Sequence, residues 1–304
     1  MQARTSPEIP SASLESLRAL ALDAGATDAV VIPAKDVLFD PRVRFKCMVP
    51  KCYMSGACAH CPPLGFTMQE VRDSVLSHGY AVFFKVEVPA RVIAATGLAG
   101  YINTGNLDPE GCVLALGAYY LLVFSIVKRL QKKAGEMGLS SRAGFAAGNC
   151  RDALCHFQPL CGEIAGTGCR HPDLSSPSME SCGMDAFSMA ARMGWEVFPI
   201  GGTCRPESVG HGTLMGLAPV GGRDAAPPAV LPRPQKPDLG LGQAKKSLAA
   251  SRQAGFNLGI LLRQGRDART WGRFLANLAD LTGSWTAAGA KLAHLFSGRP
   301  RKTS

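Results

Sequence analysis

The pattern of apolar and polar positions along the chain predicts helices that alternate with short apolar strands. Apolar side chains recur at helical spacing in four segments, and we expect helices over residues 11–24, 67–77, 110–137 and 184–193. Short apolar runs predict strands over residues 28–33, 80–88, 143–147, 195–200 and 213–220. Strands that alternate with helices are typical of an α/β protein, so we expect a mixed sheet covered by helices.

One apolar segment fits two different structures. Residues 111–127 contain no charged side chain, and four basic residues follow, which are Lys128, Arg129, Lys132 and Lys133. This length is at the lower limit for a membrane span, and flanking positive charges are typical of one. A helix buried against a sheet has the same composition. Because the segment lies between two cysteine-rich loops that belong to one body, we expect a core helix.

The distribution of charge divides the chain into two parts. The chain has 304 residues and a formal net charge of +10. Residues 1–220 carry 19 basic and 19 acidic side chains, whereas residues 221–304 carry 14 basic and 4 acidic ones. Residues 218–242 are rich in Pro and Gly, which disfavours both a helix and a central strand. We therefore predict an α/β domain over residues 1–217, a linker over 218–242 and a basic tail over 243–304.

Cysteine is the most informative residue type in the composition. The first ten residues are polar and contain Pro, unlike a secretory signal, so we expect a cytoplasmic protein with reduced thiols. Eight of the 11 cysteines fall in two loops, residues 42–63 and 148–172, with spacings C-x4-C-x5-C-x2-C and C-x4-C-x5-C-x7-C. We predict as metal ligands Cys47, Cys52, Cys58 and Cys61 of the first loop and Cys150, Cys155, Cys161 and Cys169 of the second.

Thiolates that cluster at such short spacing can converge on Zn²⁺ or on an iron–sulfur cluster, and the spacing alone does not choose between them. A loop that folds back at each ligand requires residues with positive φ. We expect these at Gly56, Gly148, Gly162, Gly166 and Gly168. The alternative is that the cysteines are small buried apolar residues. Their position in loops rich in Gly, Pro and basic residues favours ligation.

Other residues near the two loops have alternative roles. Arg151, Arg170 and His171 lie beside the cysteines of the second loop, where positive charge stabilises thiolates, although ordinary loop solvation explains them equally well. His60 and His171 are candidate ligands of a mixed Cys/His zinc site. We expect Cys112 in the core. Cys182 and Cys204 are either spare ligands or structural residues, and the structural role is favoured. Glu180 and Asp185 are candidate capping or orienting groups, with a catalytic carboxylate as the alternative.

The ordered motifs resemble a family of predicted metal-binding proteins, domain of unknown function 2284. The resemblance rests on Lys46-Cys47-x4-Cys52-x8-Cys61-Pro62-Pro63, Gly148-Asn149-Cys150, Cys169-Arg170-His171-Pro172 and Pro177-Ser178-Met179-Glu180, and it extends over residues 12–220. It implies a Cys-ligated metal, plausibly iron–sulfur, with no established reaction. The ligands that it implies are Cys47, Cys52, Cys61, Cys150, Cys155, Cys161 and Cys169. Cys58 lies outside the pattern, and the second loop has wider gaps than the usual C-x2-C-x2-C.

From these observations we expect one or two Cys-ligated centres, with [4Fe–4S] as the first choice, in a protein of redox or electron transfer. Such a protein would act with a redox partner protein, and it would be a component of an oxidoreductase if a reaction is catalysed. The second choice is a zinc-binding structural module without catalysis, and the third is a membrane-anchored scaffold. The sequence contains no phosphate-binding glycine loop, nucleophile elbow or HExxH motif.

The basic tail has an amphipathic pattern of its own. Apolar residues recur at helical spacing over residues 243–296, and the basic residues beside the second run are Arg263, Arg266, Arg269 and Arg273. Arg-rich amphipathic helices with aromatic residues are typical of segments on an anionic membrane surface. Docking on a partner, contact with nucleic-acid phosphates, packing on the body and partial disorder remain alternatives, and no recognised nucleic-acid motif is present.

Overall fold

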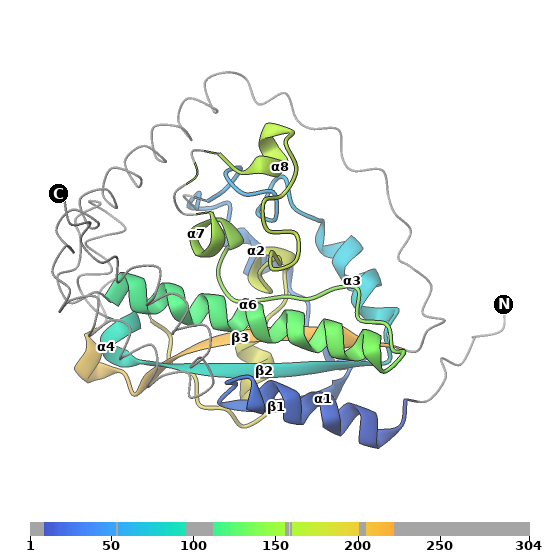
Figure 1. Ribbon diagram of the computed structural model, residues 1–304. Helices are drawn as coiled ribbons and strands as arrows, with labels where there is room; N and C mark the ends of the chain where they lie inside the picture. The colour runs from blue at the N-terminus through green and yellow to red at the C-terminus, as the bar shows by residue number, and fades with distance from the viewer. Residues whose placement is uncertain are drawn as a thin grey trace, which may run out of the picture. The chain divides into compact units, whose positions relative to one another are not determined.

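Three strands form the centre of the protein (Figure 1). The computed structural model describes residues 9–52, 54–94, 112–155, 158, 160–200 and 205–221. In this part of the chain β1 (Asp28–Pro33), β2 (Tyr80–Pro89) and β3 (His211–Val220) pair in the order β1-β2-β3. Both pairs are antiparallel, with Val30 opposite Phe83 and Phe83 opposite Leu217. The predicted α/β class is therefore confirmed.

The expected mixed sheet is a point of difference, because the described strands pair only in the antiparallel sense. Strands buried on both faces have near-continuous apolar runs, a pattern that is usually associated with parallel sheets. β2 is such a strand, since residues 81–86 are all buried. Its apolar pattern therefore carried no information about the direction of its neighbours.

The remaining elements lie before, between and after the strands. The helices are α1 (Ser11–Asp23), α2 (Pro41–Phe45), α3 (Met68–Leu76), α4 (Ala90–Ile93), α6 (Cys112–Glu136), α7 (Cys150–Leu154), α8 (Gly162–Ala165) and α9 (Ala186–Arg192). Three short 3-10 helices are η1 (Ala34–Asp36), η2 (Glu180–Cys182) and η3 (Pro206–Ser208). The four predicted helices correspond to α1, α3, α6 and α9, with ends that differ by one or two residues.

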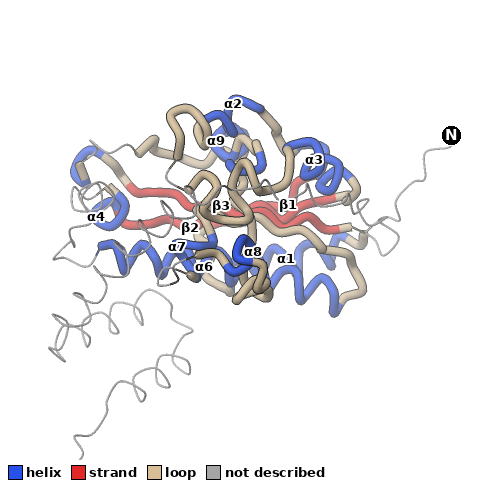
Figure 2. Tube along the Cα trace, turned by 90° about the horizontal axis from the view of Figure 1, so that it is seen from above, coloured by secondary structure: helices blue, strands red, loops and turns tan. Residues whose placement is uncertain are grey.

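Helices cover both faces of the sheet. In Figure 2, α1 and α6 lie on one side of the strands, whereas α3 and α9 lie on the other. The side chains of β2 alternate between these layers: Val82 and Phe84 join the core beneath α1 and α6, and Ala81 and Phe83 join the core beneath α3 and α9. This alternation follows from the two-residue period of a strand.

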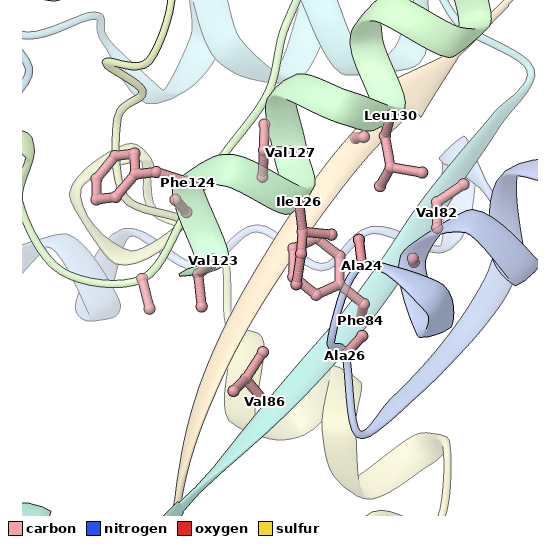
Figure 3. Close-up of a cluster of buried hydrophobic side chains, with 14 of the residues drawn as sticks. Ala24, Ala26, Val82, Phe84, Val86, Val123, Phe124, Ile126, Val127 and Leu130 are labelled. Atoms are coloured by element: carbon pink, nitrogen blue, oxygen red, sulfur yellow. The ribbon is translucent and has the colours of Figure 1, made fainter. Parts of the chain in front are cut away.

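The long helix α6 belongs to the core, as the sequence predicts for residues 111–127. Val123, Ile126 and Leu130 of α6 are buried, and Figure 3 shows them beside Phe84 of β2. None of the helices in the described part of the chain combines the length and the apolar character that a membrane crossing requires. The described part of α6 packs against the sheet and α1 through these buried residues, while Leu121 is exposed.

The helix α3 begins with a capping box. The hydroxyl of Thr67 accepts a hydrogen bond from the Glu70 backbone N–H at 3.2 Å, and the Glu70 carboxylate accepts one from the Thr67 backbone N–H at 2.6 Å. We expect Thr67→Ala to lower the free energy of unfolding by about 1 kcal/mol, because the Glu70 N–H loses its acceptor and the Glu70 carboxylate loses the hydroxyl that helps to hold it in place. Urea unfolding of the full chain measures this loss. Thr67→Ser keeps the hydroxyl and is the control; an equal loss in both variants would contradict the role of the cap.

Two predicted strands are not strands in the structure. Within residues 143–147, Phe145 alone forms a bridge, exchanging backbone hydrogen bonds of 2.8 and 2.9 Å with Leu217 of β3. Within residues 195–200, Trp195 stacks on Phe83 with ring centroids 4.8 Å apart, and its indole N–H donates to Asp28 at 2.9 Å. Both segments are apolar because their side chains fill the core, which includes Phe145, Ala146 and Ala147 of the first segment and Trp195 of the second. Burial without strand pairing therefore gives the same apolar pattern as a strand.

The end of β3 bears on the predicted domain boundary. β3 continues to Val220, and Gly221 then pairs with Ser140, so the first residues of the predicted linker belong to the sheet. The remaining linker and the basic tail lie outside the described residues.

Candidate metal centre

The first cysteine-rich loop is fixed at its start by α2. Asp40 caps this helix by accepting a hydrogen bond from the Arg42 backbone N–H at 2.8 Å. The backbone N–H of Asp40 also donates to the Gly183 carbonyl at 2.8 Å, which joins α2 to the turn that follows η2. The chain then turns through Cys47 to Cys52, where the Cys52 N–H donates to the Cys47 carbonyl at 3.2 Å.

The two loops meet at one pair of thiols. The Sγ atoms of Cys58, in the first loop, and Cys150, in the second, lie 3.4 Å apart although 92 positions separate them in the sequence. Both are free thiols and both are buried in the apolar layer beside α6. The sulfur separation in a disulfide is about 2.05 Å. Two thiolates on one tetrahedral metal ion, with metal–sulfur bonds of about 2.3 Å, lie about 3.8 Å apart. The observed contact is much nearer to the second arrangement.

Gly148 brings Cys150 to this position. It has a φ of +76°, and a Cβ there would lie 2.6 Å from the Tyr120 ring of α6. Glycine therefore lets the chain turn directly against α6 before α7 begins at Cys150. Positive φ was predicted at five glycines of the loops, and it is observed at four of them, which are Gly56, Gly148, Gly166 and Gly168. Gly162 does not have it.

The thiols around this contact titrate as a group. Interaction with the Cys150 and Cys61 side chains, together with the His60 backbone N–H, lowers the pKa of Cys58 well below that of an ordinary thiol. The same interaction with Cys58, and then burial, raises the pKa of Cys61 and that of Cys150. Cys58 is therefore the thiol of this group that gives up its proton most readily. A cation that replaced the protons of these thiols would neutralise the thiolate charge.

The remaining thiols of the second loop lie farther along the same loop. Burial first, and then the charge of the Cys161 thiolate, raises the pKa of Cys155, whereas Arg170 opposes that shift. The guanidinium of Arg170 also donates to the Leu160 carbonyl at 2.9 Å and so braces the loop. Burial lowers the pKa of Lys128 of α6, and the negative charges of Asp173 and Cys169 oppose this shift. In the sequence, Lys128 stands out only as one of the basic residues after the apolar segment 111–127, and its position near the second loop was not predicted.

Cys47 has different neighbours from Cys58. Burial raises the pKa of Cys47, and the charges of Cys52 and Glu180 raise it further. Cys182, whose role the sequence left open, is fully buried near the same groups, and burial raises its pKa to about 12. Burial also raises the pKa of Glu180, whereas hydrogen bonds with its own backbone and with the Ser178 side chain oppose this shift. No spacing signal in the sequence links Cys182 to Cys47, because their proximity arises from the packing of α2 against η2.

As the side chains lie, the described residues contain no group of three or more His, Cys, Asp and Glu side chains arranged to hold a metal ion. The structure therefore brings Cys58 and Cys150 together, with Cys61 beside them, and does not assemble the other five predicted ligands around this pair. The donor chemistry fits a metal, since soft thiolate sulfur is the preferred ligand of zinc and of iron–sulfur clusters. Complete coordination requires further thiols to move toward the pair.

Other candidate residues have structural roles or remain outside the description. Asp185 caps α9 by accepting from the Ser188 backbone N–H at 3.0 Å, as expected for a capping group. Burial lowers the pKa of His60, which favours its neutral ring. The His171 carbonyl accepts the Leu174 and Ser175 N–H groups, which forms a turn. The side chain of Cys112 and all of Cys204 lie outside the described residues.

Together, the sheet, its covering helices and the paired thiols define a cysteine-rich α/β protein with a candidate metal centre between two loops. Residues 30–210 match the family profile described as Predicted metal-binding protein (DUF2284), and the chain belongs to this family. The matched region includes both cysteine-rich loops, most of β1, and all of β2, α6 and η2. Comparison with curated proteins and with solved structures gives no significant match.

Proposed function

We propose that this protein holds an iron–sulfur centre between its two cysteine-rich loops and uses it in electron transfer. The observation that carries the proposal is the convergence of the two loops, since the free thiols of Cys58 and Cys150 are 92 positions apart in the sequence and lie in contact. Both thiols are also buried among apolar side chains, so ligation and apolar packing each account for the contact, and metal analysis decides between them. Cys61 would serve as the third ligand, and the cysteines of the rest of both loops would complete the set.

The surroundings of the pair support an iron–sulfur centre. The thiols border an apolar layer that includes Val123 and Ala147, and such surroundings limit the access of water. The His60 backbone N–H donates to the Cys58 sulfur, and hydrogen bonds of this kind tune the potential of iron–sulfur clusters. Arg170 and Lys128 supply positive charge that offsets the negative charge of a thiolate-bound cluster. When bound, such a cluster supplies one-electron chemistry.

Zinc is the second candidate, and the sulfur separation favours it. Two thiolates in contact match two ligands of a single tetrahedral ion, as in a structural Cys₄ zinc site. Such an ion would link the loops without carrying electrons. In that case Cys58 and Cys150 would hold α7 and the first loop against α6.

Anaerobic metal analysis separates the two candidates. The full chain is purified without oxygen, and iron, acid-labile sulfide and zinc are measured per chain together with the absorption spectrum. We expect iron and sulfide in equal amounts and a broad band near about 400 nm, the absorption of sulfur-to-iron charge transfer. Zinc without sulfide would overturn the iron–sulfur proposal in favour of the structural one. A chain that binds neither metal after reconstitution would overturn both.

A further inference from the structure

The turn that follows α2 exposes an apolar face. The N–H groups of Met48 and Val49 both donate to the Phe45 carbonyl at 2.8 Å, so these residues form one helical turn. Residues at positions i, i+3 and i+4 lie on the same side of such a turn. Phe45, Met48 and Val49 are 54%, 42% and 78% exposed, so this apolar side faces solvent. Large apolar residues exposed together are typical of a binding surface.

Positive charge surrounds this apolar face. Residues 41–69 contain four basic side chains, Arg42, Arg44, Lys46 and Lys51, and no acidic one. Lys46 and Lys51 are exposed. Arg42 is exposed too but is paired with Asp40 and interacts with Asp185, while Lys46 interacts with the Glu180 carboxyl. Lys46 and Lys51 are therefore the exposed cations that bring positive charge to this surface. We call Phe45, Lys46, Met48, Val49 and Lys51 the basic apolar patch.

Candidate ligands of the metal centre alternate with the residues of the patch. Cys47 and Cys52 lie within the same turns, and both are half-buried. The Cys52 N–H donates to the Cys47 carbonyl, which holds the two residues together. Electron transfer requires a short path between donor and acceptor. A protein that docks on this patch would therefore lie next to the thiols of the first loop.

We propose that the basic apolar patch is the docking surface for an acidic electron-carrier protein. This inference rests on the proposed function in electron transfer. An apolar centre with a charged rim is the usual anatomy of a protein–protein interface, and electrostatic complementarity steers the encounter. Complexes of electron transfer are small, which matches a patch of one turn. An interfacial membrane helix requires a longer amphipathic segment than the five residues of α2.

Binding is the primary measurement, since it does not depend on a working redox centre. Isothermal titration calorimetry uses the full chain with two oxidised probes, an acidic [2Fe–2S] ferredoxin and a flavodoxin, at low and moderate salt. We expect at least one probe to bind with a Kd of about micromolar, and the affinity to fall as salt rises. Cytochrome c, which is basic, is the control and should not bind.

Two substitutions test the charge, and one tests the apolar face. Lys46→Glu combined with Lys51→Glu should weaken binding by about tenfold or more, and Val49→Ser should weaken it by about threefold. Lys35→Glu combined with Arg72→Glu makes the same charge change on exposed residues of η1 and α3, and should change the Kd by less than about twofold. If the glutamate pair loses metal or solubility, Lys46→Gln with Lys51→Gln replaces it.

Three results would overturn the docking proposal. They are equal losses in the patch and control variants, the absence of binding to either acidic probe, and binding of anionic vesicles that depends on the patch while carrier binding does not. Acidic-probe binding by a chain that contains zinc and no sulfide would keep the docking surface and reject the redox role. Reduction of the centre by dithionite, together with failure of both acidic probes to bind, would keep the redox role and reject the surface.

Discussion

Replacing Cys58 by Ala should remove most of the bound metal, and replacing Cys150 by Ala should have the same effect. Each substitution deletes one member of the sulfur pair at 3.4 Å and leaves its partner without the second ligand. We expect the metal content per chain to fall by about tenfold or more in each variant, because metal affinity depends steeply on the ligand count. Metal and sulfide analysis of the anaerobically purified variants measures this fall.

The comparison between the two variants tests whether the loops share one centre. A shared centre predicts that Cys58→Ala and Cys150→Ala each lose most of the metal. If each loop held its own centre, each variant would keep about half of the metal, since the ligands of the other loop would be intact. Cys182→Ala is the matched control, because it deletes a thiol that is equally buried but is not among the predicted ligands. A loss of metal in this control would show that general destabilisation, and not ligation, explains the effect.

Phe84→Ala should be the most destabilising single substitution that we predict in the core. The Phe84 ring is fully buried between β2, α1 and α6 (Figure 3). Removing it should lower the free energy of unfolding by about 3–5 kcal/mol, since it combines the loss of apolar burial with a large cavity. Urea unfolding measures this change. Phe66→Ala is the matched control, because Phe66 is 57% exposed and its loss should cost less than about 0.5 kcal/mol.

Gly216 provides a second test of the same packing. It lies opposite Phe84 in the sheet, and a Cβ on Gly216 would overlap the Phe84 ring. Gly216→Ala should therefore cost about 1–3 kcal/mol in the wild-type chain. In the Phe84→Ala background the space is free, so the same substitution should cost much less. Additive losses in the double variant would contradict a direct clash between the two positions.

The elements that the sequence predicted correctly are those with a strong local pattern. The helix α3 follows from the amphipathic run that predicts a helix over residues 67–77. β2 and β3 follow from the apolar runs over residues 80–88 and 213–220, and the observed strands extend them to Pro89 and back to His211. The failures at residues 143–147 and 195–200 have a common reason. An apolar run records burial, and Phe145 and Trp195 are buried by contacts with β3 and β2 without forming strands.

At the candidate site, too, the sequence pattern could not show which residues come into contact. Spacing within each loop identified two groups of four thiols, but it could not show which thiol of one loop faces the other. That depends on the path of both loops over α6, including the turn at Gly148 against Tyr120. The family resemblance omitted Cys58, whereas the structure places it against Cys150. The surroundings of Cys182 and Lys128 also depend on tertiary packing.

The long sequence separation of Cys58 and Cys150 has a thermodynamic consequence. A metal bridging these residues would act as a reversible cross-link that closes a ring of about 92 residues. In the chain-entropy treatment of cross-links, a ring of this size reduces the conformational freedom of the unfolded polypeptide by about 4–5 kcal/mol. Release of the ion would return that freedom. The resistance of the domain to proteolysis would thus vary with the supply of metal in its surroundings.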